Sequence, residues 1–72
     1  MGKCAATFRE IRFVLEDELT QVFVAIEAVG DCPISVQGWH HKTFPASLSA
    51  IDILNRIGSG DDPVLWDGGA PG

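Results

Sequence analysis

The sequence predicts one small α+β domain, a three-stranded antiparallel meander followed by one C-terminal helix packed on one face of the sheet. Three observations predict this β-β-β-α order. Two neighbouring segments alternate apolar and polar residues with the period of a strand, and a third apolar segment follows a Gly- and Pro-containing turn. A last segment repeats apolar residues at helical spacing. The 72 residues leave room for a single core.

The first two strands are expected at residues 7–15 and 20–29, joined by a loop of the four residues Glu16 to Leu19. Both segments are rich in β-branched and aromatic residues. Matching their apolar faces gives a hairpin register, because a slip by one residue would turn one strand's apolar side chains toward solvent. The resulting pairs are Leu15 with Thr20, Phe13 with Val22, Ile11 with Val24 and, on the opposite face, Arg12 with Phe23, over whose ring the guanidinium could lie.

A third strand is expected from Ile34 to Phe44, after the turn signal of residues 30–33. Its alternation is not regular, because Ile34 and Val36 share a face whereas Trp39 has the opposite parity. The favoured interpretation is a β-bulge at Gly38 that resets the alternation. The alternative is a tight turn at Gln37 and Gly38 between two very short strands.

A helix of about three turns is expected after Pro45. Ser47 or Ser49 could cap it, and Ser49 with Asp52 resembles a capping box. Its apolar stripe consists of Leu48, Ile51, Leu54 (or Ile53) and Ile57. Gly58 is placed to end the helix.

The ends of the chain are expected to be less ordered than its middle. Residues 1–6 show no periodicity and are interpreted as a flexible arm, residues 7–66 as the domain, and residues 67–72 as a flexible Gly/Pro tail. A short fourth edge strand, or an apolar segment that covers the core, is expected near residues 64–66.

The net charge of −5 disfavours binding to nucleic acid or anionic lipid, which need clustered Lys and Arg. The longest apolar run is too short to span a membrane, and the N-terminus lacks the pattern of a signal peptide. We therefore expect a cytoplasmic protein. In that compartment Cys4 and Cys32 are expected to remain reduced thiols.

No residue pattern in the chain indicates catalysis, a cofactor or a metal. His40 and His41 are adjacent, and adjacent strand residues point to opposite faces, so they could not share a metal without leaving the strand. Cys32 follows Asp31, whose carboxylate would raise the thiol pKa rather than activate the thiol. We expect no enzyme, no cofactor and no small-molecule substrate.

Two surfaces are candidates for binding protein. The first is an interface of mostly large side chains, since Trp in particular is enriched in protein interfaces. Its predicted members are Arg12, Val14, Phe23, Trp39, His41 and Trp66. The second is an acidic patch, predicted from Glu16, Asp17, Glu18, Asp61 and Asp62.

The functional hypothesis is a small non-enzymatic module that binds protein, including a second copy of itself. A meander leaves exposed edge strands, which favour pairing across a two-fold axis in a homodimer. The outer sheet face, which carries Phe23, Val14 and Ala25, is the other surface through which the chain could self-associate. The alternative is an acidic inhibitor or regulator that mimics nucleic acid and docks on a basic protein. A sheet-based DNA-binding module shares the element order, but its sheet face would have to be basic.

Overall fold

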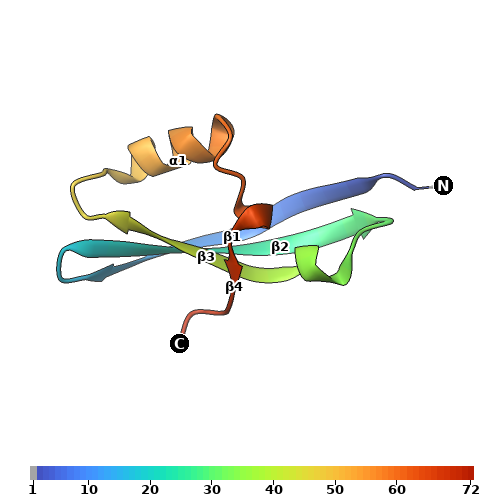
Figure 1. Cartoon of the computed structure of the whole chain (residues 1–72), viewed down its shortest axis with the longest axis horizontal. Coiled ribbons are helices and arrows are strands. Elements are labelled where there is room, and N and C mark those ends of the chain that lie inside the picture. The colour runs from blue at the N-terminus through green and yellow to red at the C-terminus, as the bar shows by residue number, and fades with distance from the viewer. Residues whose placement is uncertain (1) are drawn as a thin grey trace.

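The protein forms a four-stranded antiparallel sheet with one helix on one side of it (Figure 1). The computed structural model describes residues 2–72. The elements are β1 (Cys4–Glu16), β2 (Leu19–Gly30), the 3-10 turn η1 (Ile34–Val36), β3 (Gly38–Pro45), α1 (Ala50–Gly58), the 3-10 turn η2 (Pro63–Leu65) and β4 (Asp67–Gly68). The strands lie in the order β1-β2-β3-β4 across the sheet. The predicted α+β meander with a C-terminal helix is therefore confirmed, with a fourth strand at its edge.

The β1–β2 hairpin has the predicted register. The pairs include Leu15 with Thr20, Phe13 with Val22, Ile11 with Val24 and Arg12 with Phe23. The predicted four-residue loop is wrong in length, because Glu16 and Leu19 also pair. The turn contains Asp17 and Glu18 alone, and Asp17 has a φ of 49°, a left-handed conformation that Asp adopts more readily than most residues.

β1 begins earlier than the sequence indicated. Cys4 pairs with Gly30, so residues 4–6 of the predicted arm belong to a strand; Met1 lies outside the described residues. A β-bulge between Phe8 and Glu10 shifts the register by one residue. The bulge explains why residues 4–6 do not continue the alternation of residues 10–15, since an extra residue inverts the alternation of faces.

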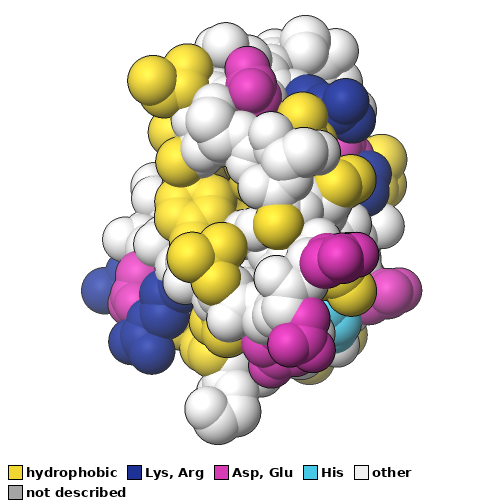
Figure 2. Space-filling view, turned by 90° about the vertical axis from the view of Figure 1, so that its left-hand side faces the viewer, with side chains coloured by type: hydrophobic (Ala, Val, Ile, Leu, Met, Phe, Trp, Pro, Cys, Tyr) yellow, Lys and Arg dark blue, Asp and Glu magenta, His cyan; other side chains and the backbone are white. Residues whose placement is uncertain are grey.

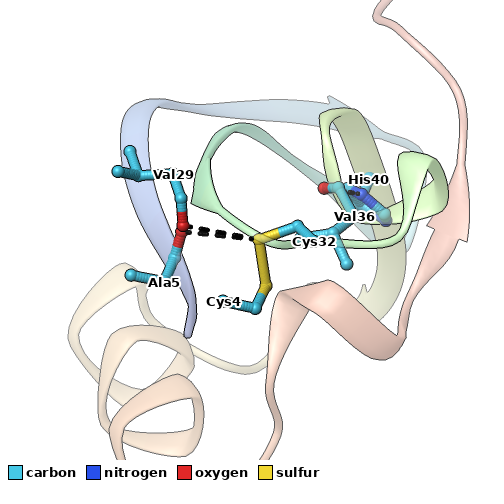
Figure 3. Close-up of a disulfide and its surroundings, with 6 residues drawn as sticks. All are labelled: Cys4, Ala5, Val29, Cys32, Val36 and His40. Carbon is cyan, nitrogen blue, oxygen red and sulfur yellow. Dashed lines mark hydrogen bonds between the residues drawn. A yellow bond between two sulfur atoms is a disulfide. The ribbon is translucent and has the colours of Figure 1, made fainter. Parts of the chain in front are cut away.

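Cys4 and Cys32 form a disulfide, so the expectation of reduced thiols is wrong (Figure 3). Their Cα atoms lie 4.7 Å apart although the residues are 28 positions apart in sequence. The hairpin brings them together, because its register places Cys4 opposite Gly30, two residues before Cys32. The Cys32 sulfur also lies 3.6 Å from the Val29 carbonyl oxygen. The bond fastens the start of β1 to the loop that leaves β2.

The third strand begins four residues later than predicted. Ile34 to Val36 form η1, and β3 begins only at Gly38, whose φ of 111° suits glycine. Neither the bulge nor the pair of short strands is therefore correct. The irregular alternation has a simple cause, because Val36 reaches the core from a 3-10 turn rather than from a strand.

The predicted capping box of α1 is confirmed. The Asp52 backbone N–H donates to the Ser49 hydroxyl at 3.2 Å, and the Ser49 N–H donates to the Asp52 carboxylate at 3.3 Å. Of the two alternatives for the apolar stripe, Ile53 is the buried one, while Ile51 and Leu54 remain exposed. Within residues 2–72, no helix combines the length and hydropathy needed to cross a membrane.

The fourth strand lies just after the position expected for it. Residues 63–65 form η2, whose first turn is capped by the Asp62 carboxylate, and β4 follows at Asp67–Gly68. Gly68 pairs with His40, and Asp67 pairs with His41. Part of the predicted tail of residues 67–72 is therefore held on the edge of β3.

The core lies between α1 and one face of the sheet, here called the inner face. Its buried apolar members are Val22, Val24, Ile26, Val36, Phe44 and Ile53. The opposite face is here called the outer face, and α1, the one α-helix within residues 2–72, does not lie on it (Figure 1). The two faces therefore have to be considered separately as binding surfaces.

Candidate interaction surfaces

The structure brings together five of the six residues predicted for the interface. They lie on the outer face, as the strand alternation and register require, and they are Arg12, Val14, Phe23, Trp39 and His41. Trp66 is on the other side of the sheet, where its ring packs edge-on against Phe44 with 5.7 Å between ring centroids. The interface as predicted is therefore divided between two faces.

Contacts among the outer-face residues reduce what they can offer to a partner. Phe23 is buried, and the His41 ring lies against it with 5.5 Å between centroids. The Arg12 guanidinium lies 5.6 Å from the centre of the Trp39 ring rather than over Phe23, which corrects the predicted stacking. The reason is that His41, on the neighbouring strand, already covers Phe23.

His40 and His41 point to opposite faces, as strand geometry predicted. His40 is buried on the inner face, where Nε2 lies 2.9 Å from the Val36 carbonyl oxygen and Nδ1 lies 3.3 Å from that of Trp66. His41 has a buried Nδ1 without a hydrogen-bond partner in the described structure. Residues 2–72 contain no group of three or more His, Cys, Asp or Glu side chains arranged to hold a metal ion.

The residues of the predicted acidic patch occupy separate places and separate roles. Glu16, Asp17 and Glu18 are at the β1–β2 turn, whereas Asp61 is bound to Lys42 of β3 at 2.7 Å and accepts a hydrogen bond from the Trp66 indole at 3.2 Å. The hydrogen bond from Lys42 lowers the pKa of Asp61. With Asp62 capping η2, the second half of the patch is used in holding the C-terminal segment.

A cleft of about 490 Å³ adjoins this ion pair where β4 meets β3. It is lined in part by His41, Lys42, Asp61, Trp66 and Asp67. The charged groups of Lys42 and Asp61 neutralise each other. The cleft therefore presents neither of these two charges in an unpaired form to a ligand.

An uncovered apolar surface lies on the inner face beside β1. Phe8 is 40% exposed, Phe13 39% and Leu15 76%, although all three point to the side of the sheet that carries the helix. A groove of about 270 Å³ separates α1 from this end of the hairpin and is lined almost entirely by apolar side chains. Figure 2 views this end of the molecule and shows hydrophobic side chains gathered on one side of it.

This surface was not predicted from the sequence, because the helix was expected to pack on the apolar face of the sheet. A comparison of lengths could have revealed it. The nine residues of α1 span about 14 Å, whereas the 13 residues of β1 span about 43 Å. One short helix cannot cover such a strand, and of the residues in α1 only Ile53 is buried in the core.

β1 is also an edge strand. It pairs with β2 on one side and, among residues 2–72, with no strand on the other, so alternate backbone N–H and C=O groups along its length are without a ladder partner. The free edge and the exposed apolar side chains belong to the same strand. We call this combined surface the β1 edge. It consists of the unpaired backbone edge of β1 and the side chains of Phe8, Phe13 and Leu15.

Comparisons with protein-family models, with curated proteins and with solved structures found no match to this chain. Its function therefore has to be argued from the surfaces themselves.

Proposed function

We propose that this chain is a non-enzymatic protein-interaction module that self-associates through the β1 edge. The observation that carries the proposal is the coincidence of a 13-residue strand paired on one side only, within the described chain, with apolar side chains left exposed on its inner face. Exposed edges of this kind pair readily with another strand. Pairing would complete the backbone hydrogen bonds and cover Phe13 and Leu15 in one step.

The β1 edge is poorly protected against such pairing. The common protective devices are proline, charged side chains (lysine above all), β-bulges and inward-pointing charge on the edge strand. β1 contains no proline or lysine, and its inner face between Ile11 and Leu15 is entirely apolar. Its one irregularity is the bulge beside Arg9. The outer face supports self-association less well, because its most apolar ring, Phe23, is already covered by His41.

The size of the protein supports the same conclusion. A chain of 72 residues buries only about 60% of the surface that its unfolded form exposes. Here the helix leaves part of that small core open. A second copy would extend the sheet and the apolar layer together, which is a common route to symmetric dimers.

The experiment is sedimentation or light scattering over a dilution series from high to low micromolar concentration. We expect a dimer that dissociates on dilution, and we expect Leu15→Glu to shift the protein toward monomer. The matched control is Ile34→Glu, which places the same charge at a residue that is 94% exposed in η1 and does not belong to β1. A wild-type protein that is monomeric at every concentration would refute the proposal.

The cytoplasmic location stays a prediction, and the disulfide weakens it. Structural disulfides persist mainly in oxidising compartments. The Cys4–Cys32 bond therefore favours an oxidising environment over the reduced one that the sequence suggested. An interaction module that functions outside a reducing compartment would have this bond in place when it self-associates.

A further inference from the structure

We infer that the second copy binds β1 antiparallel to itself, about a two-fold axis at Ile11, so that Glu10 of each copy faces Arg12 of the other. This inference rests on the proposed self-association and specifies its register. An axis perpendicular to the sheet keeps the inner faces of both copies on the same side. Two residues that lie opposite each other across the axis must then be on the same face of the sheet, either inner or outer. This condition limits the possible registers.

The charges on β1 select among these registers. Arg12 and Glu10 are exposed neighbours on the outer face and already form an ion pair within one chain. An axis at Arg12 would set two guanidinium groups opposite each other, and an axis at Phe13 would set Glu10 opposite Glu16. Like charges directly opposite in a sheet are destabilising. An axis at Ile11 instead makes two equivalent Glu10–Arg12 pairs between the copies.

The bulge in β1 determines which residues pair in the N-terminal part of the strand. Beyond Arg9 the faces of β1 are shifted by one residue, so the pairing has to skip Arg9 just as β2 does within the chain. Phe8 of one copy then faces Phe13 of the other, and Ala6 faces Leu15. The partly exposed Phe8 and Phe13 become cross-strand partners, an arrangement that stabilises sheets.

The ends of the strand fit the same alignment. Continuing the pairing past Ala5 brings Lys3 of one copy to the turn of the other, where Glu16, Asp17 and Glu18 lie. The turn carboxylates of the predicted acidic patch thereby meet a basic side chain. An axis at Val14 also gives one set of complementary pairs, Arg12 with Glu16, but it uses only the last residues of the strand.

The test is the dissociation constant of the full chain, with its disulfide intact, for three charge variants. Glu10→Arg and Arg12→Glu each replace attraction by repulsion at two symmetric sites, and we expect each to weaken the dimer by about tenfold. The double variant Glu10→Arg/Arg12→Glu restores opposite charges in this register, and we expect it to recover a constant near that of the wild type. Arg56→Glu, on α1, is the control for the general effect of added negative charge.

The outcomes separate this register from its rivals and from the proposed function. In the Val14 register the double variant would set the new carboxylate at position 12 against Glu16 and would stay weak, so failure to recover overturns the inference. The inference would also be overturned if Glu10→Arg and Arg12→Glu weakened the dimer no more than Arg56→Glu does. In that case, dissociation of the dimer by Leu15→Glu would still support self-association at the β1 edge. A wild-type monomer would refute both. If a single variant fails to fold, isotope-filtered NMR of the wild-type dimer decides, since a Phe8–Phe13 contact between copies supports the register and its absence overturns it.

Discussion

The two edges of the sheet differ in how far the rest of the chain covers them. The β3 edge is covered over part of its length by β4, by η2 and by the Trp66 side chain, and the Gly69 N–H adds a hydrogen bond of 3.0 Å to the Trp39 carbonyl. The β1 edge has no such cover within residues 2–72, and a covalent bond fastens it at its beginning, where the disulfide lies. The comparison indicates that the chain uses its C-terminal segment to close one edge and leaves the other available for pairing.

The largest effect is expected from removing the covalent fastening of β1. Cys4→Ser/Cys32→Ser opens a closed loop of 28 residues, which lowers the free energy of unfolding by about 3–4 kcal/mol in the chain-entropy account. Urea unfolding of the oxidised protein and of the double variant measures the difference. Equal midpoints would show that the start of β1 is held by strand pairing alone. Alkylation and mass spectrometry before reduction verify that the bond is present in the purified protein.

A smaller effect is expected at the covered edge from His40. Its ring nitrogens lie against the carbonyl oxygens of Val36 and Trp66, so it connects η1 to the C-terminal segment across the inner face. His40→Leu leaves the buried Val36 carbonyl oxygen without the ring nitrogen at 2.9 Å and should lower the free energy of unfolding by about 2 kcal/mol. His41→Leu is the matched control, because its buried Nδ1 has no partner to lose in the described structure. Equal effects of the two substitutions would contradict the assigned role of His40.

The smallest effect is expected from the ion pair that holds the segment before β4. The hydrogen bond from Lys42 lowers the pKa of Asp61 below its ordinary value of 3.8. The resulting stability is present above that value and is lost as the pH falls through the lower pKa of the folded state. Asp61→Asn should remove this part of the acid dependence and cost about 0.5–1 kcal/mol near neutral pH, as for other partly exposed pairs. Urea midpoints between pH 2 and 7 that change in parallel for both proteins would disprove it.

The sequence predicted the local parts of the fold well. The register of the first hairpin follows from the parity of Ile11, Phe13 and Leu15 against Val22 and Val24, because face matching leaves little freedom over such a stretch. The start of α1 follows from Ser49 and Asp52, since a capping box involves residues only three positions apart.

The candidate site could be predicted only in part. Arg12, Trp39 and His41 belong to one predicted interface, but alternation could not say that His41 would cover Phe23 or that Arg12 would turn to Trp39. These choices depend on packing between strands. Trp66 was wrongly assigned to the same interface, because its position relative to the sheet depends on the path of the chain after α1.

By itself, the sequence determined the element order, the alignment of the first two strands and the start of the helix, because periodicity, capping and face matching act over short distances. Only the tertiary structure decided that Cys4 meets Cys32, that β4 closes one edge, and that α1 leaves Phe13 and Leu15 uncovered on the other. Each of these depends on residues far apart in sequence. Their proximity is set by the assembled sheet and by the lengths of the elements packed upon it.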